Sequence, residues 1–265
     1  MELPIYQVDA FSGKVFAGNP AAVCPLDGPL DAALMQAIAA ENNLSETAFF
    51  HPEGDGFRIR WFTPVSEIDL CGHATLASAW VLFEELGHSR PEVRFMSQSG
   101  PLVVTRGAEP GLLRMDFPAW TPKPAAPSRT LVEGLRGPEP VEVLATRDWL
   151  VVYDSEEDVL QLEPDMEKLK GLDRLGVIVT AKGGPASGAD FVSRFFVPGE
   201  GIPEDPVTGS AHSTLIPYWS PRLGKRAMRA AQLSRRGGEL LCEHNGERVA
   251  ISGRAALYMR GTIYL

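Results

Sequence analysis

Hydrophobic and polar residues alternate in short runs along much of the chain, and helical spacing replaces this alternation in several places. Residues 5–11 alternate as a half-buried strand does, and residues 15–23 predict its hairpin partner across a turn at Gly18-Asn19-Pro20. Apolar residues recur at helical spacing in 30–42, and a second such segment covers 72–86. The first third of the chain therefore predicts a mixture of strands and helices.

The same mixture continues to the end of the chain. Residues 166–169 predict a short helix, and an apolar segment that begins near Gly209 predicts a longer one. Prolines recur between 118 and 129 with no periodic apolar face, which predicts a linker. We therefore expect two domains, an N-terminal half at 1–120 and a C-terminal half at 121–265. Further strand-like runs are 47–50, 57–62, 93–96, 102–105, 112–117, 141–144, 149–153, 177–180 and 191–197.

One segment of the first half recurs in the second. Residues 62–80 read Phe-x-Pro, a short acidic loop, and then Gly72-His73-Ala74 at the start of an apolar helix. Residues 196–219 read Phe-x-Pro, a slightly longer acidic loop, and then Gly209-Ser210-Ala211 at the start of another. Because these features share their order and similar spacing, we interpret them as a duplicated domain.

Composition and charge exclude several classes of protein. The chain has 265 residues, 44% of them hydrophobic and 22% charged, as in an ordinary globular protein. A net charge of −9 repels nucleic acid and anionic lipid, so neither is expected as a partner. No apolar run approaches the roughly 20 residues of a membrane span, and no secretory signal begins the chain, so we expect a cytoplasmic location. Three cysteines without a CxxC pair argue against a disulfide framework or a zinc cluster.

The two glycine-led helix starts are typical of anion sites. A glycine lets a ligand approach the backbone, and the first N–H groups with the helix dipole favour a negative charge. Two such starts facing each other would hold one small anion, most simply a carboxylate, whereas the alternative is that Gly72 and Gly209 only allow close helix packing. Polar or reactive residues beside both glycines favour the anion site: Cys71, His73, Asp205, Thr208, Ser210 and His212.

Glu46 is a candidate proton-transfer group. It stands at the entrance of the apolar strand 47–50, where partial desolvation would push the pKa of a carboxyl group upward. Such a group exchanges protons near neutral pH. The alternative is an ordinary solvated loop residue between a helix and a strand.

At these positions the sequence resembles the PhzF-like isomerase family, named after an enzyme of phenazine biosynthesis. The resemblance runs from residue 9 to about 242. The late segment Gln232-Leu233-Ser234-Arg235-Arg236-Gly237-Gly238 resembles many uncharacterised members rather than the phenazine enzyme itself. The other segments that carry it are Asp9-Ala10-Phe11, Gly18-Asn19-Pro20-Ala21-Ala22-Val23, Asn43-Leu44-Ser45-Glu46-Thr47-Ala48-Phe49, Trp61-Phe62-Thr63-Pro64, Asp69-Leu70-Cys71-Gly72-His73-Ala74-Thr75 and Glu204-Asp205-Pro206-Val207-Thr208-Gly209-Ser210-Ala211-His212.

The resemblance implies a mixed α/β (α+β) protein with the diaminopimelate epimerase fold. In that fold two pseudo-symmetric domains each form a curved sheet around a central helix, and the active site lies in the interdomain cleft. The implied activity is a cofactor-independent isomerisation of a small carboxylate-bearing metabolite, with no metal. Glu46 would move the proton, assisted by His73 and Asp205, and the implied assembly is a homodimer. The implied substrate-binding residues are Gly72, His73, Thr208, Gly209 and Ser210.

Two alternatives stay open from the residues themselves. Racemases of this fold use one cysteine from each half, and Cys71 would supply one, but Pro206 stands about where the second thiol belongs. A one-thiol racemase would have to pair Cys71 with Asp205.

The other alternative is a protein that binds a small carboxylate without turning it over. No GxSxG, GxGxxG, P-loop or HExxH motif is present, so hydrolase, dinucleotide-binding and zinc-protease functions lack their signatures.

Overall fold

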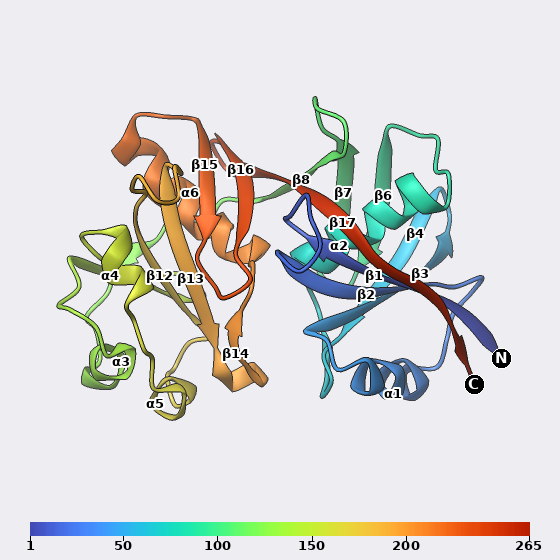
Figure 1. Ribbon diagram of the computed structural model, residues 1–265, viewed down its shortest axis with the longest axis horizontal. Coiled ribbons are helices and arrows are strands. Elements are labelled where there is room, and N and C mark those ends of the chain that lie inside the picture. The colour runs from blue at the N-terminus through green and yellow to red at the C-terminus, as the bar shows by residue number, and fades with distance from the viewer. The chain divides into compact units, whose positions relative to one another are not determined.

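The computed structural model describes residues 1–265 and divides them into two compact units (Figure 1). Unit 1 contains residues 1–116 and 252–265, and unit 2 contains residues 117–251. The sequence-based division assigned 252–265 to the second half. In the structure, β17 (Arg248–Tyr264) continues from unit 2 into unit 1 and pairs antiparallel with β1 (Glu2–Ala10), which brings Met1 into hydrogen bonding with Leu265.

Unit 1 is a mixed sheet with two helices. The predicted hairpin is confirmed: β2 (Asn19–Pro25) pairs antiparallel with β1, in register Ala10 to Asn19. The predicted helix at 30–42 is α1 (Ala32–Asn42), which begins where the Asp31 carboxylate accepts the free backbone N–H groups of its first turn. The other strands are β3 (Glu46–Glu53), β4 (Gly56–Phe62), β5 (Glu67–Ile68), β6 (Glu92–Ser97), β7 (Gly100–Arg106) and β8 (Leu112–Pro118).

The second helix of unit 1 is almost completely buried. α2 (Gly72–Trp80) packs against β1, β2 and β3, and every residue from Gly72 to Ala79 is buried. Its sequence allows this because most of these side chains are small, and the hydroxyl groups of Thr75 and Ser78 donate to backbone carbonyls one turn earlier. The predicted segment 72–86 is completed by the π-helical turn η1 (Val81–Glu85).

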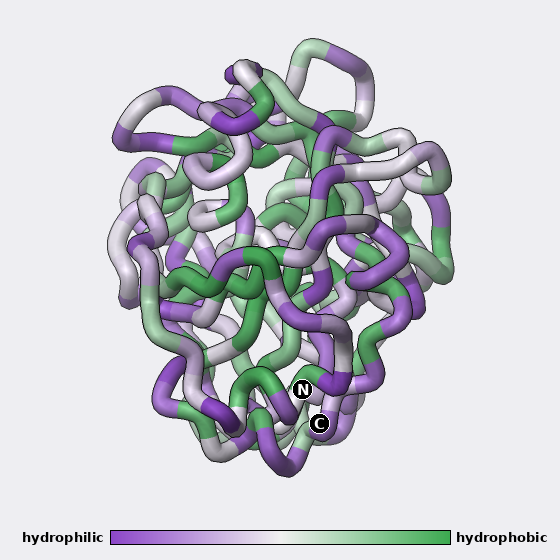
Figure 2. The backbone as a smooth tube through the Cα atoms, turned by 90° about the vertical axis from the view of Figure 1, so that its left-hand side faces the viewer, coloured by the Kyte–Doolittle hydropathy of each residue, from purple (hydrophilic) through white to green (hydrophobic).

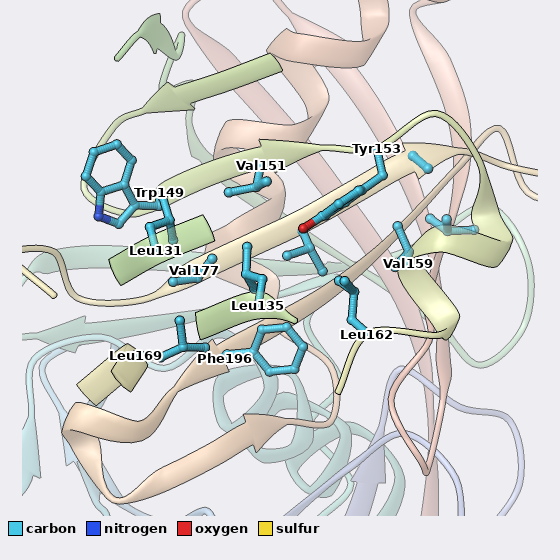
Figure 3. Close-up of a cluster of buried hydrophobic side chains, with 13 residues drawn as sticks. Leu131, Leu135, Trp149, Val151, Tyr153, Val159, Leu162, Leu169, Val177 and Phe196 are labelled. Atoms are coloured by element: carbon cyan, nitrogen blue, oxygen red, sulfur yellow. The ribbon is translucent and has the colours of Figure 1, made fainter. Parts of the chain in front are cut away.

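Unit 2 is a second mixed sheet with its own core. Figure 3 shows Trp149 and Val151 of β11 (Trp149–Val152) and Val177 of β12 (Val177–Lys182) packed with leucines of two short helices. These helices are α3 (Arg129–Leu135) and α5 (Met166–Lys170), the latter as predicted. The remaining elements are β9 (Lys123–Pro124), β10 (Glu142–Ala145), α4 (Glu156–Leu160), β13 (Phe191–Val197), η2 (Pro198–Glu200), β14 (Ile202–Asp205), α6 (Gly209–Leu223), β15 (Ala227–Gln232) and β16 (Gly238–Asn245).

The strand pairings of the two units repeat in the same order. In unit 1 the successive pairs β1–β2, β2–β3, β3–β4, β4–β5, β4–β6 and β6–β7 are antiparallel, parallel, antiparallel, antiparallel, parallel and antiparallel. In unit 2 the pairs β10–β11, β11–β12, β12–β13, β13–β14, β13–β15 and β15–β16 follow that order. The buried helices α2 and α6 occupy the same place in the two series, so the duplication predicted from the sequence is confirmed.

The predicted linker at 118–129 is only partly irregular. Lys123 and Pro124 form the short strand β9 against β10, and α3 begins at Arg129 behind a Ser128 cap. Short edge strands tolerate proline because no ladder hydrogen bond is required on their free side. The helix α4 was also not predicted, although Ser155 and Asp158 form a capping box at its start, which is a readable sequence signal.

Hydrophobic residues lie mainly in the interior, and many of the outlying loops are hydrophilic (Figure 2). None of the helices is both long and apolar enough to cross a membrane. The strands and helices of both units confirm the mixed arrangement of sheet and helix predicted from the sequence.

Candidate active site

Glu46 is the first residue of β3, paired in the parallel register with Ala21 of β2. The four residues that follow it are buried, and the Glu46 side chain itself is only 9% exposed. Strand pairing begins at Glu46, directly after the turn that ends α1, so the carboxylate lies at the buried start of the strand. Glu46 is therefore a buried strand residue and not a solvated loop residue.

His73 lies against this carboxylate. Its Nε2 atom is 3.1 Å from Oε2 of Glu46, and its side chain is 4% exposed. Burial alone would lower the pKa of His73, but the neighbouring Cys71 and Glu46 side chains raise that pKa well above its usual value. The structure thus brings together two of the residues predicted to transfer the proton.

The other ring nitrogen of His73 contacts Asn19 and Cys71. Asn19 Nδ2 lies 3.1 Å from His73 Nδ1, and Cys71 Sγ lies 3.5 Å from the same atom. Asn19 is completely buried, and Gly18 before it has a φ of +71° with the Ala10 carbonyl only 2.2 Å from where a Cβ would stand. Glycine is required there, so the segment that the sequence marked as a turn also delivers Asn19 to the histidine.

Cys71 is the residue before α2 and is 5% exposed. Burial, followed by the charge of Glu46, raises the pKa of its thiol to about 11. Glu46, Cys71 and His73 offer three donor atoms within 4.8 Å of one another. Ligand atoms of a tetrahedral zinc ion lie about 3.5 Å apart, so these three donor atoms would have to move closer together to bind zinc.

The second group of predicted residues lies at the start of α6 in unit 2. Asp205 ends β14 and is 8% exposed, and Gly209 is the first helical residue, with Thr208 as its cap. The Thr208 hydroxyl donates a hydrogen bond to Oδ2 of Asp205. Ser210, in the first turn, accepts a hydrogen bond of 3.2 Å from Arg147, whose guanidinium group lies over the Trp120 ring.

His212, one turn into α6, differs sharply from His73. It is completely buried, and its Nδ1 atom lies 2.8 Å from the carbonyl oxygen of Thr208. Burial lowers the pKa of His212 to about 4, so its ring is neutral near pH 7. A neutral ring whose N–H donates to Thr208 stabilises the helix start and holds no charge for catalysis.

Two residues around these groups were not singled out as site residues from the sequence. Asn19 of unit 1 contacts His73, and Gln232 of unit 2 hydrogen-bonds to both Asp205 and Thr208. Both belong to segments that carried the family resemblance. That resemblance was the available signal, since neither residue type is reactive and their contacts come from distant strands.

Within each unit the arrangement permits specific chemistry. In unit 1 a buried carboxylate and a buried imidazole lie 3.1 Å apart, and in unit 2 a carboxylate accepts a hydrogen bond beside a helix start. Acid/base catalysis requires such groups, and the free N–H groups of a helix start favour a bound anion. The catalytic and binding functions of Glu46, His73, Asp205, Gly72, Thr208, Gly209 and Ser210 remain predictions.

Comparison with known proteins identifies the family. Residues 8–261 match the family described as phenazine biosynthesis-like protein. An uncharacterized isomerase of Pseudomonas aeruginosa is 55% identical over the full length of both chains. A crystal structure of a PhzF-family protein from Enterococcus faecalis superposes with a TM-score of 0.95 at 48% identity, covering all of both chains.

A more distant structure shares only the fold. The hydroxyproline epimerase of Agrobacterium vitis has a TM-score of 0.66 at 11% identity, over 99% of this chain and 92% of its own. The fold predicted from the sequence, shared with epimerases, is therefore the observed one. The match over nearly the whole sequence shows that the chain belongs to the PhzF, or phenazine biosynthesis-like, family.

Proposed function

We propose that this protein is an isomerase that moves a proton between carbon atoms of a small carboxylate-bearing metabolite. The observation that supports this most directly is the buried contact of 3.1 Å between Glu46 and His73. A carboxylate withdrawn from water and paired with one imidazole is suited to accept a proton from carbon and return it. Relatives named as isomerases support the same class of reaction.

The proposed reaction balances without a cofactor. Glu46 takes a proton from a carbon next to an unsaturated group, and the electron pair of the broken C–H bond moves into that conjugated system. The proton is then delivered to another carbon, where a new C–H bond forms, so the molecule undergoes no net oxidation or reduction. His73 stabilises the charge on Glu46 or relays its proton, and Asp205 completes the acid/base set.

The experiment that tests this is exchange with heavy water. The protein is incubated in deuterium oxide with a panel of unsaturated cyclic acids, β,γ-unsaturated acids and proline derivatives, including trans-4-hydroxy-L-proline. Mass spectrometry then measures deuterium incorporated into each acid. An isomerase or racemase introduces deuterium into its substrate, whereas a protein that only binds carboxylates leaves every bound acid unlabelled, and that result would refute the proposal.

Cys71 distinguishes an isomerase that uses Glu46 from a racemase that uses a thiol. A thiol whose pKa is about 11 is a poor base at neutral pH, so Cys71→Ser and Cys71→Ala should each lower kcat by less than about tenfold, roughly 1.4 kcal/mol of barrier. The matched control is Cys24→Ser, because Cys24 is equally buried but lies within β2. A loss of several orders of magnitude for Cys71 alone would transfer the chemistry to the thiol.

Gly72 and Gly209 are predicted to bind one and the same carboxylate, on the basis of the sequence repeat. Each helix start has only a few N–H donors and about half a unit of positive charge, so one alone would bind a solvated carboxylate weakly. Gly72→Ala and Gly209→Ala should therefore each weaken binding of the same acid, measured by calorimetry, with the circular dichroism spectrum unchanged. If only one substitution weakens binding, the repeat is architectural and the shared site does not exist.

A homodimeric assembly and a cytoplasmic location belong to this proposal as well. Both come from the resemblance and the sequence. Sedimentation of the purified protein tests the dimer, and fractionation of cells tests the location.

A further inference from the structure

Gln232 is a completely buried amide that makes all its side-chain hydrogen bonds to one short loop. It is the last residue of β15 and is 1% exposed. Its Oε1 atom accepts from the Thr208 N–H at 2.8 Å, and its Nε2 atom donates to the Asp205 carbonyl at 2.8 Å and to Thr208 Oγ1 at 3.1 Å. One side chain therefore holds both ends of the segment between β14 and α6.

The chemistry of these partners fixes the direction of every bond. A backbone N–H can only donate and a backbone carbonyl can only accept, so the Gln232 amide has one possible orientation. Thr208 Oγ1 accepts a hydrogen bond from Gln232 Nε2, so the Thr208 hydroxyl is free to donate its own hydrogen bond to the carboxylate of Asp205. The result is a directed chain from Gln232 through Thr208 to Asp205.

We propose that Gln232 is a positioning residue that keeps the Asp205 carboxylate ionised and oriented by aiming the Thr208 hydroxyl at it. This inference rests on the proposed function, in which Asp205 belongs to the acid/base set. A hydrogen bond donated to a carboxylate favours its charged form, and the bond is strongest where water is excluded. Gln232 thus acts on the reaction through Asp205 without touching the substrate.

The other titratable groups of unit 2 around this loop stay the same in the variants compared below. Glu204, which precedes Asp205 in β14, points to the opposite face of the strand and is paired with Arg194 of β13 at 2.8 Å. His212 of α6 is neutral above about pH 5, because its pKa is about 4. Arg235 and Arg236 lie in the turn after β15 and are unchanged in the variants below.

The test compares Gln232→Glu and Thr208→Val with the matched control Ser234→Ala. Ser234 Oγ donates to the Pro206 carbonyl at 2.8 Å, so it holds the same loop without a link to the Asp205 carboxylate. Glutamate at 232 is isosteric, but when ionised it accepts a hydrogen bond from the Thr208 hydroxyl, which then no longer donates to Asp205. Valine at 208 removes the hydroxyl and keeps the backbone N–H that Gln232 binds.

The primary measurement is the NMR titration of Asp205 in the free protein, labelled on the carboxyl carbon of aspartate and assigned with Asp205→Asn. The midpoint should rise by about one pH unit or more in Gln232→Glu and in Thr208→Val, and stay unchanged in Ser234→Ala. The acid side of the pH profile of deuterium exchange should move in the same direction. An unchanged midpoint in Thr208→Val, or an equal shift in Ser234→Ala, would overturn the proposal.

Failure of the proposed function would look different. Wild-type protein that exchanges no deuterium into any acid, yet shows the expected NMR midpoints, would refute the isomerase and leave the hydrogen-bond chain intact. Wild-type exchange with unchanged midpoints in the variants would refute the chain alone. Should Gln232→Glu fail to fold, Thr208→Val carries the test, because it leaves Gln232 in place.

Discussion

Replacing Glu46 by glutamine should lower the rate of proton exchange by about 10²-fold to 10⁴-fold, the range over which a positioned acid or base contributes. Glutamine keeps the shape of the side chain and a hydrogen-bonding oxygen next to His73, but it cannot accept a proton from carbon. The affinity for the carboxylate ligand should change little, because the backbone N–H groups of both helix starts are unchanged. Deuterium incorporation and calorimetric binding of the same acid measure the two effects separately.

The matched control for this experiment lies at the other end of the same strand. Glu53, the last residue of β3, is paired with Arg58 at 2.9 Å and its side chain is 41% exposed. Glu53→Gln should leave exchange within a factor of two of wild type, because exposed ion pairs contribute little. If Glu46→Gln retains a tenth or more of wild-type kcat, Glu46 is not the proton-transfer group.

The sequence predicted the architecture well where local patterns and pairing agree. The β1–β2 hairpin, the helices α1 and α2 and the duplication all follow from periodicity, glycine positions and repeat order. Predictions failed where tertiary pairing decides structure. β9 is two residues long and pairs with β10, and nothing in its own sequence distinguishes it from a proline-rich linker.

The C-terminal strand shows the same limit. β17 is 17 residues long, and its last part belongs to unit 1 because it pairs with β1. A strand that leaves one unit and completes the sheet of another has no local signature of that change. Its partner is set by a strand at the opposite end of the sequence, so a boundary drawn from composition alone cannot place it.

For the candidate site, the sequence named candidate reactive residues but not the neighbours that contact them. Glu46, His73 and Asp205 were singled out by residue type and by the motifs around them. Asn19 and Gln232 are amides with no intrinsic reactivity, and their importance comes only from the atoms they contact. Sequence patterns identify side chains that could react, whereas the partners and direction of a hydrogen bond follow only from the positions of the atoms.

The buried imidazole of His212 should make the folded protein sensitive to acid. Lowering the pH from 7 to 4 should cost the wild-type protein about 3 kcal/mol of unfolding free energy through this one residue, because its pKa is about 4 when folded and about 6.5 when unfolded. Between these two pKa values His212 is protonated in the unfolded chain but remains neutral in the folded protein. The contribution of neutral His212 to the free energy of unfolding is therefore fully present above about pH 6.5 and is lost as the pH falls toward 4.

The structure gives the reason for this difference and the variant that tests it. The Nδ1 atom of His212 is committed to the Thr208 carbonyl, its Nε2 atom is buried without a hydrogen-bond partner, and its ring lies 5.9 Å from that of Phe191. Protonating Nε2 would create an unpaired charge in apolar surroundings. Asparagine places a non-titrating N–H near the position of Nδ1, so His212→Asn should lose about 3 kcal/mol less than wild type between pH 7 and pH 4 in urea unfolding. His244→Asn, at a less buried position in β16, should follow the wild-type curve, and an equal slope for all three proteins would show that His212 titrates normally in the folded state.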